Sequence, residues 1–285
     1  MRHPQYIDVV DPDEEWKKGI IGTLLKWKQV SAAIGLDITG GVVAYLYVHW
    51  TAAVLILGVL PFVATVAYIT RRNVLVRLRS DKRLHLICHE TRDDVAKIAA
   101  TDARSMQIVT QIEQFHQRTV DRVSLFFREL LEDPTANCVI RLASISECGN
   151  EYVTKARSDG LENATRTLNT EPLPFDKGLA AALRSKDFVG VYIIHEIVAA
   201  IEAGIWMRTK NDDLKDLTTL MVAPINGYES TQKVMLGILY VCSKKKDVFS
   251  PGHALPLKAV VDLLGTVYPS LISRAAKARK PKVSQ

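Results

Sequence analysis

Five basic or aromatic side chains in the second half of the chain have the chemistry to bind an anionic ligand. They are Arg141, Lys155, Arg157, Trp206 and Arg208. A guanidinium donates two parallel hydrogen bonds to a phosphate, and an indole ring stacks on a base. The alternative is that each cation lies on the solvated side of a strand and that the tryptophan is a core residue. Sequence alone leaves both interpretations open.

Motifs for metal binding and catalysis are weak. His85, Cys88 and His89 have helical spacing, but no fourth ligand of a structural zinc site is evident. His195-Glu196 lacks the second histidine of a zinc-protease motif. A nucleophile elbow, a P-loop and a dinucleotide-binding glycine pattern are all absent from the sequence. We therefore expect no enzymatic activity, no resident metal and no cofactor.

Asp37 is conspicuous because it lies inside an almost unbroken apolar run over residues 30–69. A carboxylate at the centre of a bilayer costs about 2.5–3.5 kcal/mol on insertion scales, so it should face protein, water or a partner rather than lipid. Gly40 and Gly41 follow it and would permit close helix approach. Asp37 is thus either a pore-lining or oligomer-specifying acid, or a group tolerated for structural reasons.

The apolar run itself predicts two transmembrane helices in a tight hairpin, over residues 30–48 and 51–69. Each is close to the roughly 20 residues that cross a hydrocarbon core. Lysines precede the first and arginines follow the second, so we expect the inner (cytoplasmic) membrane, with both termini and the following domain cytoplasmic. The formal net charge of +6 concentrates in that region and in the tail. Anionic lipid explains this charge, and no nucleic-acid partner is expected.

The chain divides into five predicted segments. They are a cytoplasmic N-terminal segment (1–29), the transmembrane hairpin (30–70), a long juxtamembrane helix (71–133), a folded domain (134–276) and a basic tail (277–285). Residues 71–132 contain no proline or glycine, and a heptad starting at Val95 places apolar residues at most core positions. This stripe predicts either a dimeric coiled coil, and hence a homo-oligomer, or packing against the following domain of the same chain.

Beyond residue 137 the pattern changes to short strand-like runs and helical segments. Residues 138–144 and 151–158 predict a hairpin, residues 218–225 and 233–244 predict two further strands, and residues 256–276 carry a helical apolar stripe. Strands flanked by helices predict an α+β fold with an antiparallel sheet.

The same region resembles a GAF domain. The matching motifs, in order, are Pro224-Ile225, Gly237-Ile238-Leu239 and Phe249-Ser250 before the closing helix. Residues 175–193 also resemble the pocket-lining segment of that family. The resemblance covers about residues 137–276 and implies a domain that senses a small molecule. The Asn-Lys, Phe, Asp-Glu pattern of cyclic-nucleotide phosphodiesterase GAF domains and a bilin-attaching cysteine are not recoverable.

A sensor of this kind needs an output, and only a short basic tail follows the closing helix. We therefore expect a ligand-responsive membrane protein in which a cyclic nucleotide or cyclic oligonucleotide acts through the hairpin. In architecture it resembles the two-span, membrane-permeabilising effectors of bacterial antiviral signalling. The alternative is a membrane-anchored, degenerate GAF scaffold that dimerises and recruits a soluble signalling partner.

Overall fold

The computed structural model describes residues 7–10, 68, 80–102, 107–146, 149–158, 171–185, 188, 190–207, 218–229 and 231–279. The chain forms two compact units, one of residues 1–12 and 83–285 and the other of residues 13–82. Apart from Tyr68, the two predicted transmembrane helices lie outside the described residues, and so do Asp37, Gly40 and Gly41.

The described part of residues 71–132 does not form the single long helix that the sequence predicted. A helix over residues 80–100 ends at a bend at Thr101, and a second helix, α3 (Gln107–Leu130), follows. Asp94 accepts hydrogen bonds from Arg118 Nε at 3.1 Å and from Arg122 Nη1 at 2.7 Å. The hydroxyl of Thr101 donates a hydrogen bond to Oε1 of Gln111, near the start of α3, at 3.0 Å. Contacts that run in opposite directions along the two helices show that they pack antiparallel.

The heptad stripe was predicted correctly, but its partner is in the same chain. Ile98, Ile112, Thr119 and Phe126 of the stripe are buried. Helix α3 packs against strands β2 and β3 and against helix α6. A continuous helix would leave this stripe in water, whereas folding back buries it without a second copy. Among the described residues, the intramolecular alternative replaces the coiled coil.

The sheet confirms the predicted α+β fold with antiparallel pairing. Its strands are β1 (Ile7–Val10), β2 (Asn137–Ser146), β3 (Gly149–Arg157), β4 (Leu173–Pro174), β5 (Val191–Ile194), β6 (Thr219–Glu229) and β7 (Gln232–Ser243). They lie in the order β1-β5-β6-β7-β2-β3-β4, and every neighbouring pair is antiparallel. The predicted hairpin at 138–158 and the two late strands are therefore confirmed.

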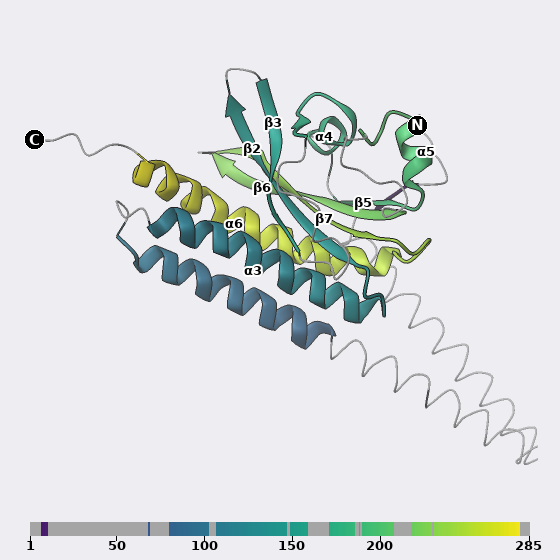
Figure 1. Ribbon diagram of the computed structural model, residues 1–285, viewed down its shortest axis with the longest axis horizontal. Coiled ribbons are helices and arrows are strands. Elements are labelled where there is room, and N and C mark those ends of the chain that lie inside the picture. Colours follow the sequence, from purple (N-terminus) through teal and green to yellow (C-terminus); the bar gives the residue numbers. More distant parts are fainter. Residues whose placement is uncertain are drawn as a thin grey trace, which may run out of the picture. The chain divides into compact units, whose positions relative to one another are not determined.

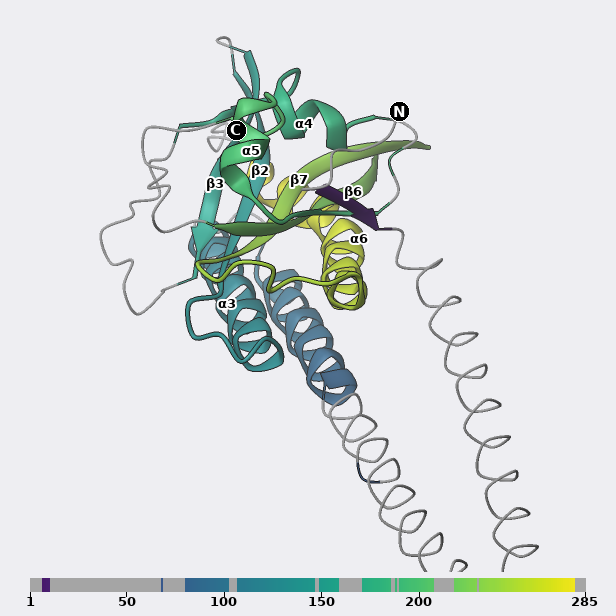
Figure 2. The same ribbon diagram turned by 90° about the vertical axis from the view of Figure 1, so that its right-hand side faces the viewer.

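Helices cover both faces of this sheet (Figures 1 and 2). Helix α3 and the closing helix α6 (Ala254–Arg279), which follows the short turn η1 (Pro251–His253), cover one face. The short helices α4 (Gly178–Leu183) and α5 (Ile197–Glu202) lie on the other. Each face has its own cluster of buried side chains. The sheet therefore separates two cores with different neighbours.

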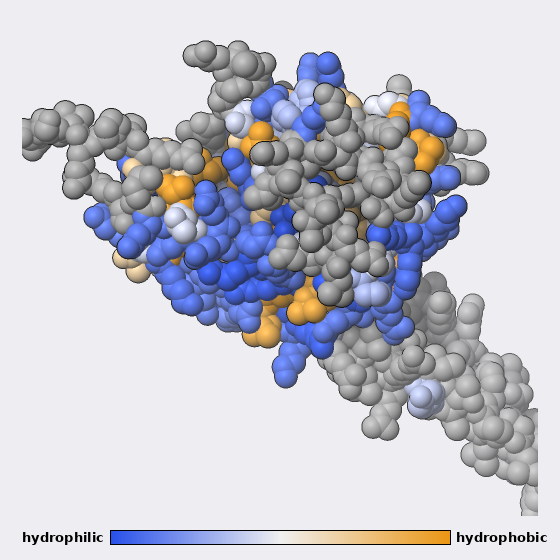
Figure 3. All heavy atoms as spheres, in the orientation of Figure 1, coloured by the Kyte–Doolittle hydropathy of each residue, from blue (hydrophilic) through white to orange (hydrophobic). Residues whose placement is uncertain are grey.

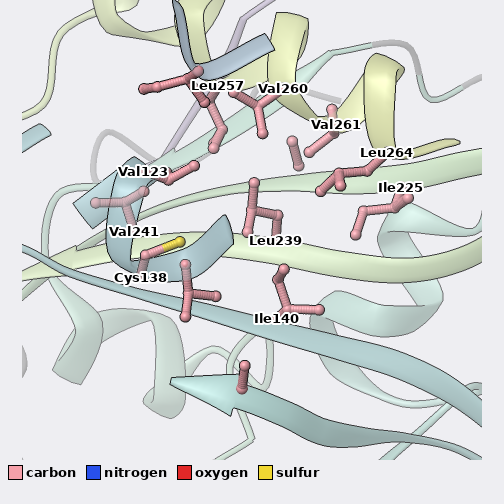
Figure 4. Close-up of a cluster of buried hydrophobic side chains, with 14 of the residues drawn as sticks. Val123, Cys138, Ile140, Ile225, Leu239, Val241, Leu257, Val260, Val261 and Leu264 are labelled. Carbon is pink, nitrogen blue, oxygen red and sulfur yellow. The ribbon is translucent and has the colours of Figure 1, made fainter. Parts of the chain in front are cut away.

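The core under α6 is purely apolar at its centre. Side chains of α6 point onto those of β2, β6 and β7 (Figure 4), and the labelled contacts are Leu257, Val260, Val261 and Leu264 against Ile140, Ile225, Leu239 and Val241. Burying each such side chain contributes about 1.5–3 kcal/mol. By length and composition, residues 251–278 form the one helix that could cross a membrane among the described residues. Its packing on the sheet identifies it as a core helix.

The fold explains why proline, glycine and phenylalanine suit the positions that carry the GAF resemblance. Pro224 pairs with Ile238 of β7 but lies past the last residue of β6 that pairs with β5, so on the β5 side there is no ladder for its missing N–H to break. A Cβ on Gly237 would lie 2.4 Å from the main-chain oxygen of Arg141, so only glycine permits this strand contact. Phe249 is buried and leads into α6.

Strand β1 was not predicted from the sequence. Residues 7–10, placed in a plain cytoplasmic segment by the sequence analysis, pair with β5 from Ile7↔Ile194 to Val10↔Val191. Four residues are too short a run to stand out by periodicity. The N-terminal strand and the chain from residue 83 onward thus belong to one unit, and the intervening segment leaves it and returns to it.

Candidate functional site

The face of the sheet under α4 and α5 carries an aromatic cluster with two arginines. Its buried aromatic members come from five different elements or their flanks: Tyr152, Phe188, Tyr192, Trp206 and Tyr240. Strand alternation places Tyr152, Tyr192 and Tyr240 there, whereas Phe188 and Trp206 lie in segments outside the strands. We call this set, together with Arg141, Arg184 and Phe175, the aromatic face.

Arg141 is the most unusual member because it is a cation in the core. It is only 2% exposed and lies on β2 beside a bulge between residues 140 and 141. Its Nη1 donates to the main-chain oxygen of Glu171 at 2.9 Å, while its Nε has no hydrogen-bond partner among the described residues. A buried guanidinium is costly unless an anion or full hydrogen bonding compensates it. Within the described part of the chain, no carboxylate forms an ion pair with it.

Arg184, directly after α4, forms the second cationic element. Its guanidinium carbon lies 4.3 Å from the centre of the Phe175 ring, and its Nη1 donates to the Tyr152 hydroxyl at 3.1 Å. Burial raises the pKa of Tyr152, and the hydrogen bond and charge of Arg184 partly offset that rise. Tyr152 and Phe175 also contact each other, with ring centres 4.4 Å apart. Arg184 is thus held over an aromatic platform while remaining exposed.

Trp206 lies on the same face, at the end of the segment after α5. It is 5% exposed and packs edge-on against Tyr240 of β7, with ring centres 6.0 Å apart. Tyr240 pairs with Val139, two residues from Arg141 on β2, so the tryptophan and the arginine share a face. The indole Nε1 is buried without a hydrogen-bond partner among the described residues. Its N–H is therefore a second polar group available to a ligand.

The structure places three of the five predicted ligand-binding residues, Arg141, Arg157 and Trp206, on the same face of the sheet. Lys155 is exposed on β3 and lines a cavity on the opposite side of the sheet, under α3 and α6. Arg157 pairs with Val139, a residue of the core under α4 and α5, so it lies on the side of the aromatic face. Its main-chain oxygen accepts a hydrogen bond from Gln117 at 2.9 Å. Arg208 lies outside the described residues. The predicted set therefore divides between two regions of the fold.

Sequence reasoning missed Arg184, Tyr152 and Phe175. Arg184 follows an alanine-rich helical run and looks like an ordinary helix-end cation, and the aromatic residues look like core. Their association depends on β4 returning along β3, where Leu173 pairs with Tyr152. The only available signal was the resemblance of residues 175–193 to a pocket-lining segment.

The described residues give no support for a metal centre. No group of three or more His, Cys, Asp or Glu side chains with metal-binding geometry occurs in the described ranges. The rings of His85 and His89 contact each other edge-on, with centres 4.4 Å apart.

Comparisons with known proteins give structural similarities at low identity. No family model matches the chain, and no curated protein matches it. A GAF domain from a phosphoenolpyruvate-protein phosphotransferase of Coxiella burnetii is 17% identical, covers 68% of this chain and 98% of its own, and has a TM-score of 0.45. A putative GAF sensor protein from Burkholderia vietnamiensis is 13% identical, with coverages of 70% and 99% and a TM-score of 0.41.

A third similar structure is an enzyme, the free methionine-R-sulfoxide reductase of Neisseria meningitidis in complex with its substrate. It is 14% identical, covers 69% of this chain and 92% of its own, and has a TM-score of 0.37. At these scores the similarities add no argument of their own. The description of the domain as GAF-like rests on the motif residues and on the antiparallel sheet in which they lie.

Proposed function

We propose that this chain is a ligand-responsive membrane protein whose GAF-like domain binds an anionic small molecule on the aromatic face and acts through residues 30–70. The observation that carries the proposal is Arg141, a guanidinium in the core with an unpartnered Nε among the described residues. An anionic ligand would compensate this charge. Without one, the arginine is an expensive choice for a core position.

The composition of the aromatic face favours a nucleotide-like ligand, and we propose a cyclic nucleotide or cyclic oligonucleotide. Arg141 and Arg184 supply charge-assisted donors for phosphate oxygens. The aromatic rings supply surfaces for a base, since stacking contributes about 1–3 kcal/mol per base. The Trp206 N–H adds a donor for a base or sugar oxygen.

The connection of the chain supports a hairpin with both ends on one side of the membrane. Strand β1 and the chain from residue 83 onward belong to the same unit, so the segment between them leaves and returns to one body. If that segment crosses a membrane, it must cross an even number of times. The two predicted helices over 30–48 and 51–69 satisfy this condition, and we propose the inner membrane with a cytoplasmic sensor domain.

We propose a binding role rather than an enzymatic one. Cysteine thiols are possible nucleophiles, but Cys138 and Cys242 are both buried on neighbouring strands and belong to opposite faces of the sheet. Burial raises the pKa of the Cys138 thiol well above its usual value, which suppresses the reactive thiolate. Neither cysteine is therefore a good nucleophile.

Calorimetry on the full-length protein in lipid nanodiscs tests the ligand, with cyclic mono-, di- and oligonucleotides as titrants. We expect one class to bind, and we expect Arg184→Gln to weaken its binding at least tenfold because an exposed charge-assisted contact is lost. Lys233→Gln, at an exposed lysine of β7, is the matched control and should bind like the wild type. Absence of binding across the panel by folded protein would remove the proposed ligand.

A scaffold remains the rival function, and one observation favours it. Phe188 and Tyr192 already stack on each other, with ring centres 4.6 Å apart and an interplanar angle of 1°. Self-packed aromatic side chains need no ligand. Growth and dye-release assays separate the two functions: an effector permeabilises membranes when triggered, and Asp37→Leu or Gly40→Leu changes that effect. A scaffold tolerates replacement of residues 30–70 by an unrelated hairpin.

A further inference from the structure

A hollow in the described part of the fold lies on the opposite side of the sheet from the aromatic face. It has a volume of about 810 Å³ and is lined by α3, by β2 and β3, and by the C-terminal half of α6. Ligand pockets have volumes of roughly 300–1,000 Å³ and are mainly apolar with a few polar groups. Ile112, Leu142 and Leu271 form part of its apolar wall. Figure 3 shows a hydrophobic area at the left-hand end of α6, in an otherwise mainly hydrophilic described surface.

Several polar side chains line this hollow, namely Glu113, Gln114, Gln117, Ser144, Thr154, Lys155 and one that is buried, His116 on α3. Its side chain is 4% exposed, and Nε2 has no hydrogen-bond partner among the described residues. An unsatisfied buried nitrogen costs about 1–3 kcal/mol, which a bound hydrogen-bonding group would recover. Burial, and to a smaller extent the nearby charge of Lys155, together lower the pKa of His116 to about 4. The imidazole is thus neutral at pH 7 and lies close to an ammonium group.

Lys155 gives this end of the hollow a positive charge. It is exposed, lines the hollow, and acts electrostatically on His116. Glu113 also lines the hollow and is exposed, but it is not among the charges that act on the imidazole. The hollow therefore has a long apolar wall, a neutral hydrogen-bonding nitrogen and a cation beside that nitrogen. These three features are complementary to an alkyl chain that ends in a carboxylate.

We propose that the hollow between α3, α6 and the β2–β3 hairpin is a second ligand site, which binds an amphipathic carboxylate of the fatty-acid type. The alkyl chain lies against Ile112, Leu142 and Leu271. The carboxylate pairs with the Lys155 ammonium and accepts a hydrogen bond from His116. This site is separate from the aromatic face because β2 presents Leu142 to one core and Arg141 to the other.

Site-resolved photolabelling tests the proposal on full-length protein in phosphatidylcholine nanodiscs. The probe is a palmitate analogue with a diazirine in its chain, and labelled peptides are identified by mass spectrometry. We expect saturable labelling of α3 and of residues 268–276, competed by palmitate but not by hexadecane. Competition that fails, labelling that does not saturate, or labels confined to other segments would each overturn the site.

Two variants sharpen the test. Ala275→Phe fills the hollow and should reduce labelling at least tenfold, and Lys155→Met removes the cation at an exposed position and should reduce it by a similar factor. Ala203→Phe, at an exposed position after α5, is the matched control and should label like the wild type. Because Lys155→Met changes only a surface charge, unchanged labelling of this variant overturns the proposal even if Ala275→Phe does not fold. Labelling that falls as protein concentration rises would show that a second copy covers the hollow instead.

Discussion

The carboxylate of Asp8 on β1 lies 2.9 Å from Nε2 of His195, which directly follows β5. The contact lies beside the antiparallel pair of β1 and β5, and its two residues are 187 positions apart in the sequence. Residues 13–82 follow β1 in the chain, and the chain returns to the unit that contains β1 at residue 83. The contact between Asp8 and His195 helps to hold β1 in that unit. The chain therefore connects this unit to residues 13–82 twice, through β1 and through the helix over residues 80–100.

Val10→Asp should release β1 without unfolding the domain. Val10 is 4% exposed and belongs to the core under α6, so an aspartate there would be a buried, unpaired charge. We expect β1 docking to lose about 2–4 kcal/mol, and hydrogen exchange to show loss of protection confined to residues 7–10 and β5. Val198→Asp, at a position on α5 that is 45% exposed, is the control and should keep wild-type protection. Equal exchange in both variants would contradict the docked strand.

Asp94→Asn should loosen the antiparallel pair formed by α3 and the helix over residues 80–100. Asp94 is 5% exposed and bonds to both Arg118 and Arg122. Hydrogen bonds to a charged group are worth roughly 1.5–3 kcal/mol, and we expect a loss of about 2 kcal/mol in denaturant unfolding because the arginines are partly solvated. Asp262→Asn removes the exposed pair with Lys258 and should cost less than about 0.5 kcal/mol. Similar losses for both would argue against a buried role for Asp94.

His116 should make the domain acid-sensitive in a defined window. Its pKa is about 4 in the folded state, chiefly because of burial, and close to 6.5 when unfolded. Below pH 6.5 the unfolded chain therefore binds a proton that the folded chain does not. Stability should fall from pH 6.5 to about 4 and this contribution should then level off, with a total of about 3 kcal/mol. His116→Gln should flatten this part of the profile of unfolding free energy against pH, and parallel profiles would contradict the assignment.

Gly265→Ala should destabilise the packing of α6 on β6. A Cβ at this position would lie 1.9 Å from the main-chain oxygen of Asn226, so one of the two elements must move. Overpacking of this kind costs about 1–3 kcal/mol and outweighs the roughly 1 kcal/mol that alanine gains over glycine in a helix. Thermal unfolding should show a lower Tm. Gly252→Ala is the control, because the nearest atom would lie 3.8 Å away.

How much of the candidate site could be predicted depended on the kind of residue. Arg141 and Trp206 were identified because a cation or an indole among apolar runs is visible in the sequence. Arg184 and Phe175 were not, since their role depends on the contact of Arg184 with Tyr152 and on the course of β4 beside β3. Lys155 was predicted for the same site and lies at a different one, because β3 pairs with β2 next to a bulge and pleat alternation changes there.

The sequence by itself determined the local elements, since each depends on periodicity and turn chemistry within about ten residues. The hairpin of β2 and β3, the pair of β6 and β7, the closing helix and the stripe on α3 all follow from such patterns. Only the tertiary structure decided what those elements contact. It folded the helix over residues 80–100 back onto α3, added β1 to β5, and divided the charged residues between two faces of the sheet. These outcomes depend on which apolar surfaces are buried together, a comparison of free energies across the whole chain that no local pattern contains.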